Sequence, residues 1–122
     1  MIRTKRVYDP PAAEDGTRVL VDRLWPRGLT KEESRIDWWA KELAPSDKLR
    51  RWFGHSPPRY REFVERYKSE LNGGDAVARL LALAERENVT LVYAARDTRH
   101  NNARALIEIF GLQAPGPATV QR

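Results

Sequence analysis

The 122-residue chain contains no cysteine, one methionine and two histidines. Without cysteine it can form no disulfide, thiolate nucleophile or zinc–thiolate site. Its histidines, His55 and His100, lack the H-E-x-x-H spacing of helical zinc sites, so we expect no metal centre. Apolar runs are too short for a membrane span, and the first residues lack the apolar stretch of a signal peptide. We therefore expect a cytoplasmic protein with no membrane contact.

Hydrophobic residues make up 41% of the chain and charged residues 32%, which is typical of a globular protein and not of a disordered one. The length is that of one domain. We expect a single α/β domain over residues 1–112. Residues 113–122 carry two prolines and no apolar periodicity, which predicts a C-terminal tail. The net charge of +5 modestly favours anionic partners.

Short apolar, β-branched segments predict strands at residues 2–8, 17–22 and 89–95. Apolar residues at helical spacing follow Ser46 and Pro57 and predict a helix after each. Asp75 is expected to cap the next helix. A last helix should begin near Thr98 and stop at Gly111. Residues 36–44 stay ambiguous between strand and irregular structure. Strands joined through helices usually lie parallel, so the prediction is an α/β fold with a mostly parallel sheet flanked by helices.

Two polar runs, residues 22–28 and 96–102, directly follow predicted strands. Ligands of open α/β sheets bind outside the carboxyl ends of the strands, so both runs are candidates for one site. An arginine guanidinium binds phosphate or carboxylate bidentately. The candidate ligand-binding residues are Arg23, Arg27, Arg96, Asn101 and Trp25. Asp22 and Asp97 would orient the arginines.

Catalysis would need an acid or base, and His100, expected in the first turn of the last helix, is the first candidate. Asp22 and Asp97 are further catalytic candidates. Each also has a simpler interpretation: Asp22 as a local partner of Arg23, Asp97 or Thr98 as a helix cap, and His100 as a surface side chain. No nucleophile elbow or glycine-rich phosphate loop is present, so the reaction and any cofactor stay open.

Several motifs together resemble one family. They are V-D-R-L-W-P-R-G at residues 21–28, W-x-K-x-L-A-P-S at 39–46, L-R-x-W-F-x-H at 49–55, R-x-F-x-x-R-Y at 61–67 and T-L-V-Y-A-A-R-D at 90–97. The pattern is similar to the YeaO-like proteins and covers about residues 2–112. These are short bacterial and archaeal cytoplasmic proteins built on a domain of unknown function.

The resemblance implies little chemistry. Some members carry a uroporphyrinogen methyltransferase label, but this chain has no glycine-rich adenosylmethionine loop. A late Cys-His-Arg motif of the wider superfamily falls near His100, where the cysteine is missing, so no thiol chemistry is expected.

Three functions follow as hypotheses. The first is binding of a small anionic, phosphate-bearing ligand at the carboxyl edge of the sheet, with or without catalysis. The second is a nucleic-acid-binding or regulatory module, suggested by the net charge and by arginines among the tryptophans. The third is a protein-interaction module anchored by Trp38 or Trp39. The oligomeric state stays open.

Overall fold

The computed structural model describes residues 1–71 and 73–112. The predicted tail over residues 113–122 lies outside them. In chain order the elements are β1 (Ile2–Arg6), the 3-10 turn η1 (Ala13–Asp15), β2 (Thr17–Leu20), α1 (Lys31–Ser34), β3 (Trp38–Trp39), η2 (Lys41–Leu43), α2 (Asp47–Phe53), η3 (Pro57–Arg59), α3 (Tyr60–Leu71), α4 (Asp75–Arg86), β4 (Val89–Tyr93) and α5 (Asn102–Phe110). In this part of the chain no helix is long and apolar enough to cross a membrane.

The four strands form one sheet in the order β1-β4-β2-β3, and every neighbouring pair is parallel. The α/β prediction is therefore confirmed. All three predicted strands end two residues earlier than predicted, β1 at Arg6, β2 at Leu20 and β4 at Tyr93. A turn closed by the hydrogen bond from Asp9 N to the Arg6 carbonyl ends β1. β2 ends because the side chain of Asp22, in place of a main-chain carbonyl, accepts the Ala94 N–H.

Side chains of the central strands alternate between two apolar cores. Leu91, Tyr93 and Val19 belong to the larger core, which includes side chains of α2, α3, α4 and α5. Leu20 and Val92 point to the other face and belong to a smaller core. The rest of that core comes from the loops, with Val7, Ile36, Trp25, Leu29, Trp39 and Ala94. Strand residues i and i+1 face opposite sides of a sheet, so helices cover one face and mainly loops the other.

The predicted helices form, with corrections at two N-termini. α5 begins at Asn102, with Asn101 as its cap, and not near Thr98. The Asp97 side chain accepts the N–H groups of Arg99 and His100 in a turn before α5, so the helix begins later in the sequence. Asp75 is the first residue of α4 and does not cap it; Gly74 holds the cap position at φ 97°. The predicted stop at Gly111 is confirmed by its left-handed backbone.

The ambiguous segment at residues 36–44 contains the short edge strand β3. Trp38 and Trp39 pair with Val19 and Leu20 of β2. The indole Nε1 of Trp39 donates to the Asp22 carbonyl at 2.9 Å, which ties this edge to the end of β2.

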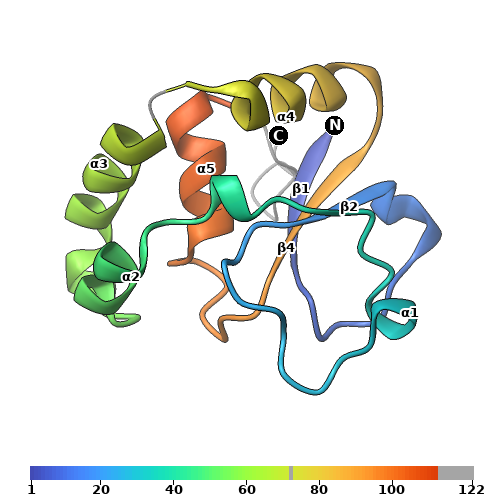
Figure 1. Cartoon of the computed structure of the whole chain (residues 1–122), viewed down its shortest axis with the longest axis horizontal. Helices are drawn as coiled ribbons and strands as arrows, with labels where there is room; N and C mark the ends of the chain where they lie inside the picture. Colours follow the sequence, from blue (N-terminus) through green and yellow to red (C-terminus); the bar gives the residue numbers. More distant parts are fainter. Residues whose placement is uncertain (72, 113–122) are drawn as a thin grey trace, which may run out of the picture.

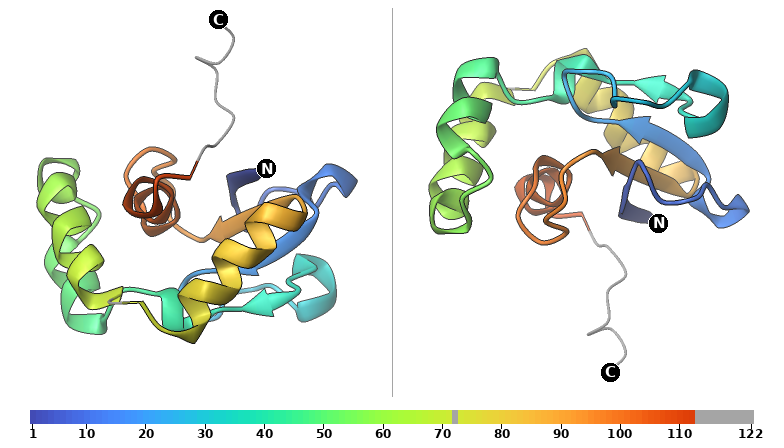
Figure 2. Two further views of the ribbon diagram at one scale, coloured as in Figure 1. Left: turned by 90° about the horizontal axis from the view of Figure 1, so that it is seen from above. Right: turned by 90° about the horizontal axis from the view of Figure 1, so that it is seen from below.

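Figures 1 and 2 show how the elements sit around the sheet. In both, α5 lies between α3 and the strands, and α2 and α3 form the outer side of the molecule. The loop after β2 and the loop after β4 emerge together at the lower side of Figure 1. This is the carboxyl end of the parallel sheet.

Candidate functional site

A cavity of about 690 Å³ lies at the carboxyl end of the sheet. Its walls come from the loop after β2 (residues 22–27), the loop after β4 (residues 94–97) and the first residues of α5. Side chains of α2 and α3 close it from the far side. The two polar runs that follow predicted strands therefore meet in one cavity.

Asp22 is held at the junction of β2, β4 and α5. One carboxylate oxygen accepts the Ala94 N–H at 2.8 Å, and the other accepts the Asn102 amide at 2.9 Å. The same amide nitrogen of Asn102 donates to the Val21 carbonyl at 2.7 Å. Burial raises the pKa of the Asp22 carboxyl, and these hydrogen bonds offset the rise only in part. Asp22 lines the cavity with its hydrogen-bonding oxygens already engaged.

The arginines that line the cavity differ in how they are held. Arg23 Nε donates to the Pro45 carbonyl at 3.3 Å and lies 3.9 Å from the Asp47 carboxylate. Arg50, which the sequence prediction missed, pairs with Asp47 at 3.4 Å. Within the described residues, the guanidinium groups of Arg27 and Arg96 make no hydrogen bond or ion pair. These two are the cations most available to a ligand.

Asp97 lines the cavity, but its oxygens are used within its own loop. It accepts the N–H groups of Arg99 and His100 at 2.8 and 3.0 Å, and its second oxygen lies 2.9 Å from His100 Nδ1. The hydrogen bond from Arg99 N is the largest cause of the lowered pKa of the Asp97 carboxyl, and the contacts with His100 add to it, whereas burial opposes the shift. The side chain of Asp97 orders this loop.

His100 is not among the lining residues, so the structure separates this acid–base candidate from the arginines. It precedes α5, whereas the sequence placed it in the first turn of that helix. Its ring packs edge-on against Tyr60, with the centroids 5.1 Å apart.

Asn101 and Trp25 reach the cavity but also have structural contacts. Asn101 is buried, and its side-chain oxygen caps α5 by accepting the Arg104 N–H at 2.9 Å. The indole of Trp25 donates to the Leu29 carbonyl at 2.7 Å and meets Trp39 edge-on.

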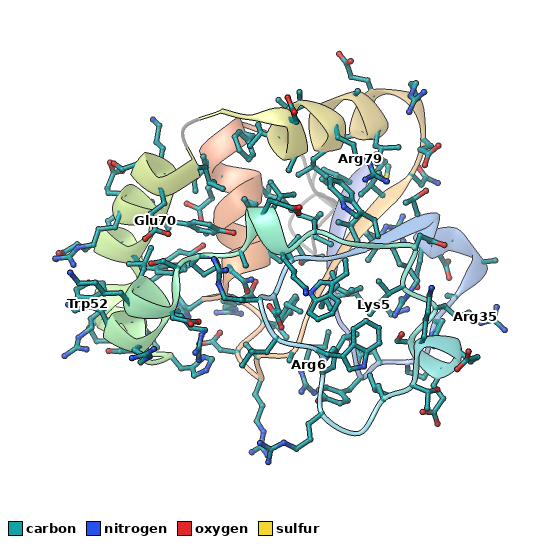
Figure 3. All side chains as sticks on the ribbon, in the orientation of Figure 1. Lys5, Arg6, Arg35, Trp52, Glu70 and Arg79 are labelled. Carbon is teal, nitrogen blue, oxygen red and sulfur yellow. The ribbon has the colours of Figure 1, made fainter. Side chains whose placement is uncertain are left out.

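Residues far from the two polar runs complete the site. The guanidinium of Arg6, labelled in Figure 3, donates to the carbonyls of Ala95 and Ala94 and so fixes the loop after β4. Phe53 and Phe63 come from α2 and α3. His55 lines the cavity from just beyond the end of α2, after Gly54. Phe53 and Phe63 reach the cavity because of how α2 and α3 pack on the sheet. No local sequence pattern predicts that packing.

Metal binding finds no support in the geometry. Across residues 1–71 and 73–112, no group of three or more His, Asp or Glu side chains could hold a metal ion.

Comparison with known proteins places the chain in a family. The chain is 43% identical to the uncharacterized protein YeaO of Escherichia coli K12 over 108 residues, which are 88% of this chain and 94% of the relative. It is also 43% identical to the uncharacterized protein Rv3073c of Mycobacterium tuberculosis H37Rv over 109 residues, 89% of this chain and 92% of that one. No solved structure matches. The sequence profile described as the inactive DUF488-N3 subclade matches residues 1–114. The chain therefore belongs to the DUF488 family, in its inactive N3 subclade.

Proposed function

We propose that this protein binds a small phosphate-bearing anion in the cavity at the carboxyl end of its sheet. The proposal rests on which charged side chains around that cavity already have partners within the chain. The guanidinium groups of Arg27 and Arg96 make no bond within the described residues, whereas Asp22 and Asp97 are hydrogen-bonded by the chain itself. Positive charge is thus available to a ligand, and the negative charge is already engaged.

Binding without chemistry is the form of the proposal that the chain supports best. The chain has no cysteine. His100, the histidine paired with Asp97, lies off the cavity, and His55, which lines it, makes no hydrogen bond to a carboxylate within the described residues. The matched subclade is described as inactive.

The tryptophan-based alternatives receive less support from the geometry. Trp38 and Trp39 are half-buried, and each carries one of the chain's own cations over its ring: Arg79 at 3.9 Å and Lys41 at 4.0 Å. Trp52, at the outer side of α2 in Figure 3, is flanked by Arg59 and Arg66. Faces covered in this way offer less area to a base or a partner.

The proposal is tested by titrating inorganic phosphate and methyl phosphate into wild type and Arg96→Ala with calorimetry. Loss of a charged hydrogen-bonding partner should weaken binding about tenfold or more. Arg99→Ala is the matched control, because Arg99 is an exposed arginine of the same loop that does not line the cavity.

An equal loss in Arg96→Ala and Arg99→Ala would contradict a discrete site. Binding only of polyanions, with steep weakening by salt, would replace the proposal with the nucleic-acid hypothesis.

A further inference from the structure

The cavity is much larger than a lone anion requires. Its volume of about 690 Å³ falls within the range of about 300–1,000 Å³ typical of pockets that enclose drug-sized molecules. A ligand that fills it needs an uncharged body in addition to the group bound by the arginines.

The lining residues separate by exposure into a buried aromatic part and an exposed charged part. Phe63 and Phe53, 1% and 5% exposed, lie within the larger core and also line the cavity. The guanidinium-bearing residues Arg27, Arg50 and Arg96 are all exposed. The interior is therefore suited to an apolar group, and an anion is best placed near the mouth.

The part of the cavity beside Asp22 is unfavourable for phosphate. Asp22 lines the cavity with the Ala94 N–H and the Asn102 amide directed at its oxygens, so these donors are used. At the start of α5 the Arg104 N–H is also used, because it donates to the side chain of Asn101. A phosphate pushed inward would meet a carboxylate and no free donor of this group.

We infer that the ligand is an aromatic phosphomonoester, bound with its ring inward and its phosphate at the mouth on Arg27 and Arg96. The inference rests on the proposed function and adds the class and direction of the ligand. A flat ring matches the aromatic edges of the interior, which favour edge-to-face or offset packing. A nucleoside monophosphate is one class of molecule with this combination of groups.

The test compares phenyl phosphate with methyl phosphate and inorganic phosphate by calorimetry on the full chain. Burial of the ring should make phenyl phosphate bind about tenfold more tightly than methyl phosphate. Equal affinities would overturn the inference and leave the proposed function standing. If none of the three anions binds, both fail.

Two variants probe the mouth of the cavity. Leu24 lines the cavity but is 62% exposed, so it belongs to the mouth, and Leu24→Ser should not disturb the core. With the ring inward, Leu24→Ser should leave the affinities for phenyl phosphate and inorganic phosphate nearly unchanged, whereas Arg96→Ala should weaken both. A Leu24→Ser protein that loses affinity severalfold for phenyl phosphate alone would place the ring at the mouth and contradict the inference.

The direction of the ring is tested by saturation-transfer NMR on bound phenyl phosphate. With the ring inward, the proton para to the phosphate lies deepest and should receive more saturation from the protein than the ortho protons. The reverse order would place the ring outside and overturn the inference.

Discussion

Asp15 and Asp22 lie at opposite ends of β2, and their carboxylates are satisfied in different ways. Asp15 is 2% exposed and pairs with Arg18 at 2.7 Å and Lys5 at 3.2 Å. Within the described residues, Asp22 receives hydrogen bonds only from the neutral donors Ala94 N and Asn102. One strand thus joins a buried ion-pair network at its amino end to a cavity at its carboxyl end.

The pKa shifts of the two carboxyls have opposite signs. Burial would raise the pKa of Asp15, but the hydrogen bond from Ala12 and the pairs with Lys5 and Arg18 outweigh it and lower that pKa. Burial raises the pKa of Asp22, and no cation of residues 1–71 or 73–112 forms an ion pair with it. A fully paired charge supports the fold, whereas a charge held by neutral donors costs the fold free energy at neutral pH.

The largest expected effect comes from removing the charge of Asp15. Asp15→Asn leaves Arg18, 3% exposed, buried without its anion and should lower the free energy of unfolding by about 3–5 kcal/mol. Urea denaturation measures the loss. Asp47→Asn removes an exposed partner of Arg50 and should cost less than about 1 kcal/mol. Equal losses in the two variants would remove the basis of the comparison.

A smaller effect is expected from Asn102, the residue that holds Asp22. Asn102→Ala leaves the Val21 carbonyl and one Asp22 oxygen without this donor, which should lower the free energy of unfolding by about 1–3 kcal/mol. Thermal denaturation checks it against Thr98→Ala, because Thr98 is exposed and its side chain makes no hydrogen bond within the described residues. A wild-type melting temperature for Asn102→Ala would show that this contact contributes little.

The smallest effect is the pH dependence of the stability difference between wild type and Asp22→Asn. Its sign should be opposite to that expected for Asp15. Because the folded pKa of Asp22 is raised, the wild type loses stability relative to this variant as the pH rises from about 3.9 through the folded pKa. The folded pKa of Asp15 is lowered, so its contribution is present above about 3.9 and is lost as the pH falls through the folded value.

Denaturation of wild type, Asp22→Asn and Asp15→Asn between pH 2.5 and about pH 7 measures both trends. At neutral pH, Asp22→Asn should lie within about 1 kcal/mol of wild type, and the deficit of Asp15→Asn should shrink on acidification. Parallel pH profiles for the two variants would contradict opposite pKa shifts.

Local patterns predicted the parallel sheet and the loops at its carboxyl end. β-branched runs between helical segments placed the starts of β2 and β4 correctly, although both strands end two residues early, and polar residues after them meet at the cavity. The start of α5 was wrong, because Asp97, Thr98 and Asn101 are all good cap residues and only the tertiary contacts choose among them. His100 was misplaced for the same reason.

Contacts between distant segments could not be predicted. Arg18 is only three residues from Asp15, but nothing in this turn-rich stretch indicates that the ion pair is buried or that Lys5 of β1 joins it. Arg50 and Phe63 enter the cavity from helices whose orientation depends on packing. Sequence periodicity gives the buried face of a helix but not the residue at its edge that reaches a site.

The strand order has a consequence for folding during synthesis. β4 lies between β1 and β2 but is the last strand of the described residues to be made, so β1 has no neighbour in the sheet until residue 93 has emerged. Until then only β2 and β3 can pair. Such non-local pairing slows folding and leaves strand edges open on the nascent chain. The central position of β4 thus makes completion of the sheet a late step in the life of the polypeptide on the ribosome.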